Sequence, residues 1–100
     1  IVGFTRLMEG EPPQRTIDFL RVFHEHMAAC IFRHGGTLDK FIGDGVMATF
    51  GTPDPHPDDE ARALACALDM VRAVEAWNRG RRVRGLATVR IAVGVHAGPV

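Results

Sequence analysis

Two stretches of the chain repeat apolar residues at spacings of three and four, the period of an amphipathic helix. The first opens at Glu11-Pro12-Pro13, because proline is tolerated in a first helical turn, and should end at Gly35-Gly36. The second follows the acidic run 58–60, whose charges suit a helix N-terminus, and should end before Gly80. The positions expected to face the core are Ile17, Leu20, Phe23, Met27, Cys30 and Ile31 in the first helix and Leu64, Ala67, Leu68, Val71, Val74 and Trp77 in the second.

Between these helices, apolar and polar residues alternate with the period of two that is typical of strands. Leu38, Lys40 and Ile42 share one face of a first strand, and residues 46–50 return antiparallel to it. The segment Gly43-Asp44-Gly45 carries an Asp-Gly turn signal, so it should connect the two strands as a hairpin.

Both ends of the chain also indicate strands. Ile1-Val2 is typical of the end of a strand that leads into a loop at Gly3, and residues 89–95 alternate along another strand. The order of strand, helix, hairpin, helix and strand predicts an α+β fold of the ferredoxin-like, split βαβ kind, with an antiparallel sheet and helices on one face. Since the first residue is not methionine and both ends are apolar, we expect residues 1–100 to be one domain truncated at both ends.

The composition narrows the class of protein. The chain has 100 residues, 46% hydrophobic and 24% charged, which suits one small globular domain. Its formal net charge is zero, so no overall field draws it to nucleic acid or to an anionic membrane. No apolar run reaches the roughly 18 residues that cross a bilayer, and no signal peptide opens the chain. Cys30 and Cys66 lie among apolar neighbours, which favours buried thiols in a reducing compartment over a disulfide.

The predicted hairpin carries the most informative polar pair. Lys40 and Asp44 share parity along the strand, so both tend toward one side of the hairpin and could face one ligand. Gly43 and Gly45 flank the carboxylate and allow a close approach of the backbone to a ligand. The alternative is a solvent-facing lysine beside an aspartate that only forms the turn.

Other polar residues are weaker candidates. Gly3-Phe4-Thr5 lies where a strand passes toward a helix, and it could offer backbone N–H groups and a hydroxyl to a phosphate. His24 and His26 point about 200° apart on a helix, so they cannot bind one metal ion together. We expect them to lie on a solvated face. The loop residues Asp54, His56, Asp58 and Asp59 could form a metal site, but helix capping and solvation are expected instead. Cations after the second helix, at Arg79, Arg81, Arg82 and Arg84, are expected to complement the helix dipole rather than to bind nucleic acid. His96 is expected to be a polar group bonded near a strand end.

Three segments together resemble successive motifs of the class III adenylate/guanylate cyclase catalytic domain. They are IVGFT at residues 1–5, KFIGDGVMATFG at residues 40–51 and VGVHAGPV at residues 93–100. Their order and spacing agree with that family, so the resemblance covers essentially the whole chain. In that family, two aspartates hold two metal ions that bridge a triphosphate. The first aspartate would immediately precede Ile1, and the second matches Asp44.

The resemblance also implies roles for individual residues. Asp44 would be the catalytic metal ligand, and the backbone carbonyl of Ile1 would help to hold a metal, with two Mg²⁺ or Mn²⁺ ions in each active site. The implied substrate-binding residues are Gly3, Phe4, Thr5, Lys40 and Gly43. Of these, Lys40 matches the position that reads the purine. A lysine there can donate to N1 of adenine, whereas guanine-specific members carry a glutamate that accepts from guanine.

The resemblance therefore implies an adenylate cyclase, a lyase that converts ATP to 3′,5′-cyclic AMP and pyrophosphate in cyclic nucleotide signalling. It implies a homodimer with the active site between two catalytic domains, so that Lys40 and Asp44 of one chain serve opposite sites. It further implies a cytoplasmic catalytic domain, attached regulatory or sensor domains, and a full-length protein that can be membrane-attached. We expect residues 1–100 alone to be inactive, because the first metal-binding aspartate lies outside them.

Three alternatives stay open. One is guanylate specificity, against which the charge of Lys40 argues. Another is a catalytically degenerate domain that binds nucleotide or only dimerises and regulates a partner. The third is the diguanylate cyclase fold, whose Gly-Gly-Asp/Glu-Glu-Phe hairpin tip does not match Gly35-Gly36 here, since these glycines precede a strand.

Overall fold

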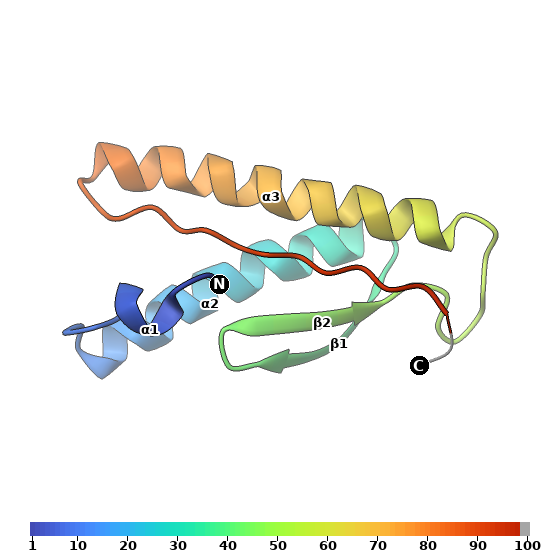
Figure 1. Ribbon diagram of the computed structural model, residues 1–100, viewed down its shortest axis with the longest axis horizontal. Helices are drawn as coiled ribbons and strands as arrows, with labels where there is room; N and C mark the ends of the chain where they lie inside the picture. The colour runs from blue at the N-terminus through green and yellow to red at the C-terminus, as the bar shows by residue number, and fades with distance from the viewer. Residues whose placement is uncertain (99–100) are drawn as a thin grey trace.

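The computed structural model describes residues 1–98 and contains two long helices, one short helix and an antiparallel hairpin (Figure 1). In chain order the elements are α1 (Phe4–Leu7), α2 (Pro13–Arg33), β1 (Thr37–Ile42), β2 (Gly45–Thr49) and α3 (Asp59–Val83). The long helices pack against each other, and α2 also packs against the hairpin. This arrangement confirms the predicted α+β fold with an antiparallel sheet and helices. Within residues 1–98, no helix combines the length and the apolar character needed to cross a membrane.

Helix α2 ends where the two glycines predict. Gly35 has a left-handed φ of 71°, and its N–H donates to the carbonyl of Phe32 at 3.1 Å. The Gly36 N–H donates to the carbonyl of Ile31 at 2.9 Å, which completes a Schellman motif. A Cβ atom at Gly36 would lie 2.7 Å from the ring of Phe50. The first glycine therefore ends the helix, and the second lets the end of the hairpin pack closely on it.

The hydrophobic core lies between α2 and α3. Its buried side chains are Phe19, Phe23, Met27, Cys30 and Ile31 from α2, Cys66, Met70 and Val74 from α3, and Val89 from the segment that follows α3. Both cysteines are buried and unbridged. Burial raises the pKa of the Cys66 thiol to about 11, so this thiol stays protonated at neutral pH.

Several apolar residues predicted to face the core are exposed instead. Ile17 on α2 is 58% exposed, and Leu64 and Leu68 on α3 are 56% and 60% exposed. Val71 is also exposed, at 40%. Helix α3 instead turns toward α2 the face that carries Cys66, Met70, Val74 and Asn78. The sequence pattern could not select this face, because apolar and small residues surround much of this helix.

Helix α3 also runs further than predicted, through Gly80 to Val83. The Arg81 side chain lies over the rings of Phe19 and Trp77, with its Cζ atom 5.2 and 5.4 Å from their centroids. Its Nε donates to the carbonyl of Ala87 at 2.7 Å. These contacts hold the last turn of α3 in place, so a single glycine does not end the helix. Trp77 packs against the core, as the sequence predicts.

Strand β1 contains a bulge at Asp39, because Leu38 and Lys40 pair with consecutive residues of β2. Leu38 packs against the core, and the ring of Phe41 stacks on His24 with 4.1 Å between centroids. Both apolar residues therefore face the helices, whereas Lys40 is exposed on the open face of the hairpin. The prediction that Leu38 and Lys40 share a face is wrong, because the extra residue changes the alternation.

The two predicted end strands are absent from the described residues, where β1 and β2 are the only strands. Val89 is buried and Arg90 is exposed, so the predicted alternation holds there. However, between residues 84–98 and the N-terminal residues, the described structure has one backbone hydrogen bond, from the Val2 N–H to the Arg90 carbonyl at 2.8 Å. A strand needs a continued ladder of such bonds. At the other end, Val2 leads directly through Gly3 into α1 rather than into a loop.

Two glycine substitutions should change stability in opposite directions. Gly36→Ala should lower the free energy of unfolding by about 1–3 kcal/mol, because the added methyl group overlaps the ring of Phe50. Gly80→Ala should raise it by about 0.5–1 kcal/mol, because Gly80 lies inside α3 with open space around its Cα. Urea denaturation followed by circular dichroism measures both. Equal effects of the two substitutions would contradict the close approach at Gly36.

Candidate functional site

The hairpin turn brings Asp44 beside the first residue of the chain. The main-chain nitrogen of Ile1 lies 3.3 Å from Asp44 Oδ2 and 3.4 Å from the Asp44 carbonyl oxygen. The carboxylate remains accessible, with 37% of the Asp44 side chain exposed. The structure therefore brings together the two residues that the sequence predicts as metal ligands, although 43 positions separate them.

Two local features produce this approach. Gly43 adopts a φ of 55°, a left-handed conformation that a tight turn requires, and the turn carries Asp44 at the tip of the hairpin. On the other side, Ile1 packs against the core, and Val2 is held by its hydrogen bond to the Arg90 carbonyl. The carboxylate and the start of the chain are thus positioned by different parts of the molecule.

The predicted phosphate segment forms the start of α1. Gly3 has a φ of 64° at the N-terminal boundary of this helix, with no atom within 4 Å of a Cβ at that position. Phe4 is anchored against Phe19, with 6.3 Å between ring centroids, and Thr5 is exposed. The first amides of a helix have no acceptor within the helix, so their N–H groups can receive an anion. Only Val2 and Gly3 separate Ile1 from this helix in the chain.

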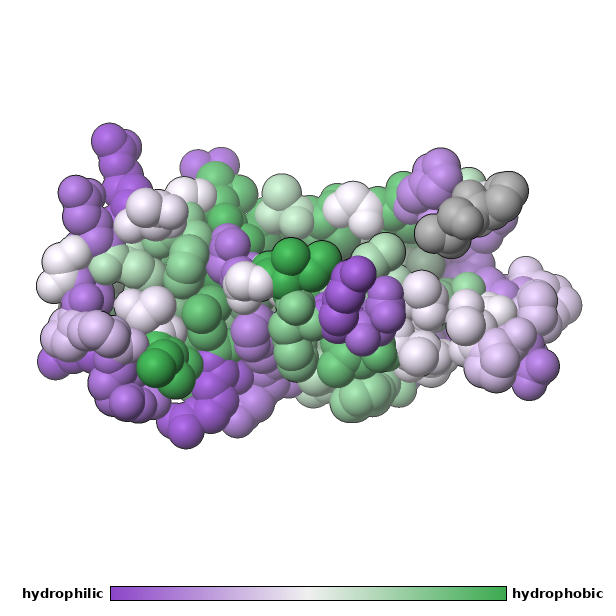
Figure 2. Space-filling view, turned by 90° about the horizontal axis from the view of Figure 1, so that it is seen from below, coloured by the Kyte–Doolittle hydropathy of each residue, from purple (hydrophilic) through white to green (hydrophobic). Residues whose placement is uncertain are grey.

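Lys40 makes no polar contact with this group in the described structure. Within residues 1–98, its side chain makes no hydrogen bond or ion pair, and none joins it to Asp44. Exposed apolar residues lie beside it, namely Ile42 at 57% and Met47 at 39% exposure. Apolar side chains also gather over the middle of the face seen in Figure 2. Lys40 is thus an exposed cation beside apolar side chains.

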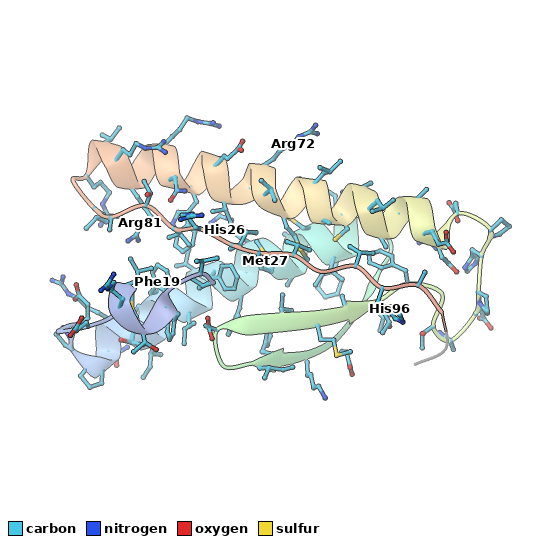
Figure 3. All side chains as sticks on the ribbon, viewed as in Figure 1. Phe19, His26, Met27, Arg72, Arg81 and His96 are labelled. Carbon is cyan, nitrogen blue, oxygen red and sulfur yellow. The ribbon has the colours of Figure 1, made fainter. Side chains whose placement is uncertain are left out.

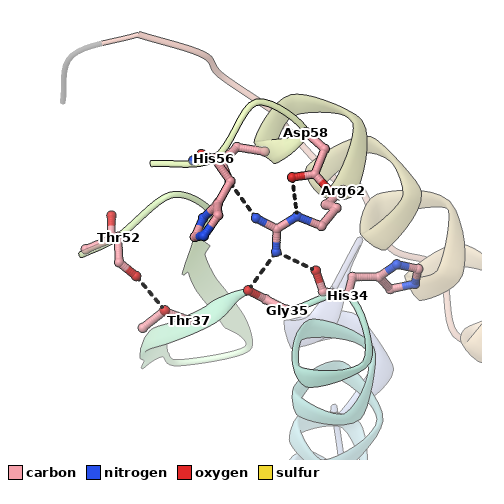
Figure 4. A network of polar contacts seen from close by, with 8 residues as sticks. His34, Gly35, Thr37, Thr52, His56, Asp58 and Arg62 are labelled. Atoms are coloured by element: carbon pink, nitrogen blue, oxygen red, sulfur yellow. Dashed lines mark hydrogen bonds and ion pairs between the residues drawn. The ribbon is translucent and has the colours of Figure 1, made fainter. Parts of the chain in front are cut away.

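Arg62 of α3 holds the junction between α2 and the hairpin (Figure 4). Its Nη1 donates to the carbonyls of His34 and Gly35 at 3.3 and 3.1 Å. Its Nε lies 3.3 Å from Asp58 Oδ1, and its Nη2 donates to Asp59. Sequence reasoning missed Arg62, because a single arginine within a helix has no spacing signature. This guanidinium links the end of α2 to the start of α3 and so sets where β1 begins.

The acidic loop before α3 is held by these contacts and forms no cation site. Asp59 Oδ2 accepts a hydrogen bond from the backbone N–H of His56 at 2.7 Å. The predicted role of Asp58 as a cap is not observed, since its side chain pairs with Arg62 rather than with a backbone N–H. In the described part of the chain, no group of three or more His, Cys, Asp or Glu residues could hold a metal ion.

The histidines differ from prediction in their surroundings. His24 and His26 are half-buried rather than solvated: His24 stacks on Phe41, and His26 lies 5.3 Å from the ring of Trp77 (Figure 3). The two rings thus contact different elements, as their spacing on the helix requires. His96 is exposed, and residues 1–98 provide no hydrogen bond for its predicted structural role.

The chain matches the family model described as "Adenylate and Guanylate cyclase catalytic domain" over residues 1–100. Among curated relatives, adenylate cyclase 1 of Rhizobium meliloti strain 1021 is 31% identical over 98 residues, covering 98% of this chain and 15% of that protein. The adenylate cyclase of Anabaena cylindrica is 33% identical over 104 residues, covering 100% of this chain and 20% of that protein. The chain therefore spans one fifth or less of the length of these relatives.

Two solved structures share the fold. The crystal structure of the guanylyl cyclase Cya2 has a TM-score of 0.79 and 38% sequence identity, and the match covers 88% of this chain and 45% of that chain. The crystal structure of the adenylyl cyclase CyaB from P. aeruginosa has a TM-score of 0.80 and 29% identity, covering 88% and 46%. The similarity thus extends to proteins named for either purine.

The Arg62 contacts give a stability prediction. Arg62→Met should lower the free energy of unfolding by about 1–3 kcal/mol, because it removes donors from two backbone carbonyls and leaves Asp59 without its cation. Arg72→Met is the matched control: Arg72 is exposed on the same helix and makes no hydrogen bond or ion pair within residues 1–98. Its effect should stay within about 0.5 kcal/mol. Similar losses in the two variants by urea denaturation would contradict this role of Arg62.

Proposed function

Because the chain belongs to the family of adenylate and guanylate cyclase catalytic domains, we propose that the protein carrying it converts ATP to 3′,5′-cyclic AMP and pyrophosphate. Residues 1–100 form one part of that catalytic domain. The observation that carries the proposal is the contact between Ile1 and Asp44, 3.3 Å apart, at the edge of the hairpin that also bears Lys40. In the reaction, the ribose 3′ oxygen attacks the α-phosphorus, the bond to the bridging oxygen breaks, and pyrophosphate leaves.

Asp44 and Ile1 fit a divalent cation. Two oxygens of Asp44, from the carboxylate and from the carbonyl, lie within 3.4 Å of the main-chain nitrogen of Ile1, so both face the residue whose carbonyl would join them. Such hard oxygen donors suit Mg²⁺ or Mn²⁺. Two such ions per site, held in part by the Asp44 carboxylate and the Ile1 carbonyl, would lower the pKa of the 3′-hydroxyl and neutralise charge on the phosphates. Asp44 is therefore assigned as the catalytic metal ligand.

The start of α1 binds the phosphates in this proposal. Gly3 lets the backbone approach an anion closely, since open space surrounds its Cα. The N–H groups of Phe4 and Thr5, together with the exposed hydroxyl of Thr5, donate to phosphate oxygens. Gly43, which also has open space around its Cα, leaves the hairpin turn free of a side chain next to Asp44. Positioning and charge stabilisation of this kind supply most of the catalysis in phosphoryl transfer.

Lys40 supports the choice of ATP. Its ammonium group can only donate hydrogen bonds, which suits the unprotonated N1 of adenine and not the N1–H of guanine. The two similar structures carry names for different purines, so this specificity rests on the charge at position 40.

The proposal includes a homodimer, in which Lys40 and Asp44 of one chain serve opposite active sites. Each active site would take the metal ligand from one chain and the purine-reading lysine from the other. The two-fold axis of the dimer would then create two identical active sites. Attached regulatory or sensor domains and a cytoplasmic catalytic domain complete the proposal. The attached domains agree with the small share of the curated relatives that this chain spans, 15% and 20%.

The direct test replaces Asp44. In the protein that carries this sequence, Asp44→Ala should lower cyclic AMP formation from Mn-ATP at least about a hundredfold, because charge stabilisation of the phosphates is lost. Asp54→Ala is the control: this exposed loop carboxylate makes no ion pair among the described residues, and its removal should leave the rate unchanged. Undiminished activity of Asp44→Ala would overturn the metal role. A wild-type protein that binds nucleotide without turnover would favour the degenerate, regulatory alternative.

The purine assignment is tested at Lys40. Lys40→Glu should lower the ratio of kcat/KM for ATP to that for GTP by about 10- to 100-fold, because a carboxylate accepts from guanine and repels the adenine N1 lone pair. Asp39→Asn changes the charge of the neighbouring exposed residue and should leave the ratio unchanged. An unaltered preference for ATP in the Lys40→Glu variant would show that position 40 does not read the base.

A further inference from the structure

Asn78 is the only buried residue with a polar side chain among residues 1–98. It lies on the core face of α3, one turn after Val74, and is 7% exposed. Its Nδ2 donates to the carbonyl of Val89 at 2.8 Å, and its Oδ1 accepts from the N–H of Val89 at 2.7 Å. One amide side chain thus satisfies both backbone groups of a single residue, as a neighbouring strand would do. Without it, both buried groups of Val89 would lose their partners.

A short series of contacts connects Asn78 to the proposed metal site. Asn78 holds Val89, and the carbonyl of the next residue, Arg90, accepts from the Val2 N–H at 2.8 Å. Val2 follows Ile1, whose nitrogen lies 3.3 Å from Asp44 Oδ2. No strand ladder holds residues 84–98 in the described structure. The Asn78 amide is therefore a main polar anchor of the segment against which the start of the chain rests.

We infer that Asn78 is a positioning residue for the metal-binding side of the site. It fixes Val89 and Arg90, which in turn hold Val2 so that Ile1 stays against Asp44. This inference rests on the proposed function, because it concerns the metal that Asp44 and Ile1 would hold. Lys40 lies on the open face of the hairpin and has no contact with this series. Loss of Asn78 should therefore weaken metal binding and leave the preference for ATP over GTP unchanged.

The test uses two substitutions of Asn78 and one control. Asn78→Leu removes both hydrogen bonds at similar volume, and Asn78→Asp keeps the acceptor but loses the donor. Val74→Ala is the control. It opens a cavity on the same face of α3, but the Val74 side chain makes no hydrogen bond to Val89. Mn²⁺ affinity is measured by electron paramagnetic resonance, with Mn²⁺ added and no nucleotide. Hydrogen exchange measures the protection of the Val2 amide. The purine preference is measured as the ratio of kcat/KM values.

Both Asn78 variants should bind Mn²⁺ about 10-fold more weakly, as is typical when support for a metal ligand is lost. The Val2 amide should exchange faster in them than in Val74→Ala, which is expected to keep the wild-type Mn²⁺ affinity although it unfolds at a lower temperature. If Asn78→Leu does not fold, Asn78→Asp decides the question. Wild-type Mn²⁺ affinity in a folded Asn78 variant would overturn the inference, and so would equal weakening in Val74→Ala.

Asp44→Ala, measured alongside, separates this inference from the proposed function. If Asp44→Ala weakens Mn²⁺ binding and the Asn78 variants do not, the positioning role fails and the proposed function stands. If Asp44→Ala binds Mn²⁺ like the wild type, the metal role of Asp44 fails, and the inference that rests on it fails as well.

Discussion

Helix α2 packs on α3 and on the hairpin at the same time, and the rest of the structure depends on this double contact. Met27, Cys30 and Ile31 are at most 1% exposed, so the middle of α2 is closed off from water on its buried face. Full burial of a large apolar side chain contributes roughly 1.5–3 kcal/mol. Since the hairpin and α3 share this one helix, a shift of α2 would move both of them.

Polar side chains of α3 then fix neighbouring segments of the chain at two places along the packed helices α2 and α3. Near its start, Arg62 binds the carbonyls of His34 and Gly35, which connect the end of α2 to β1. Near its end, Asn78 binds the returning segment at Val89. The first contact bears on where the hairpin carries Asp44, and the second on where Ile1 lies. Helix α3 therefore contributes to the position of both halves of the proposed site, although none of the site's residues belongs to that helix.

The sequence predicted the elements whose cause is local. The paired glycines 35–36 end α2 because left-handed backbone and a Schellman motif need only neighbouring residues. The Asp-Gly turn forms the hairpin for the same reason. The bulge at Asp39 could not be predicted, because both registers leave apolar residues on each strand face. Only contact with α2 favours the register that buries Leu38 and stacks Phe41 on His24.

The residues of the proposed site divide in the same way, into those that local sequence identifies and those that only the folded structure brings together. The sequence by itself determined the three family motifs, and with them the residues Lys40 and Asp44 as candidates, because each motif is a property of a few neighbouring residues. The tertiary structure decided that Ile1 meets Asp44 and that Asn78 rather than a strand holds Val89. It also decided which face of α3 is buried. These outcomes depend on groups that are far apart in the chain, and their hydrogen bonds and burial exist only once the elements have packed.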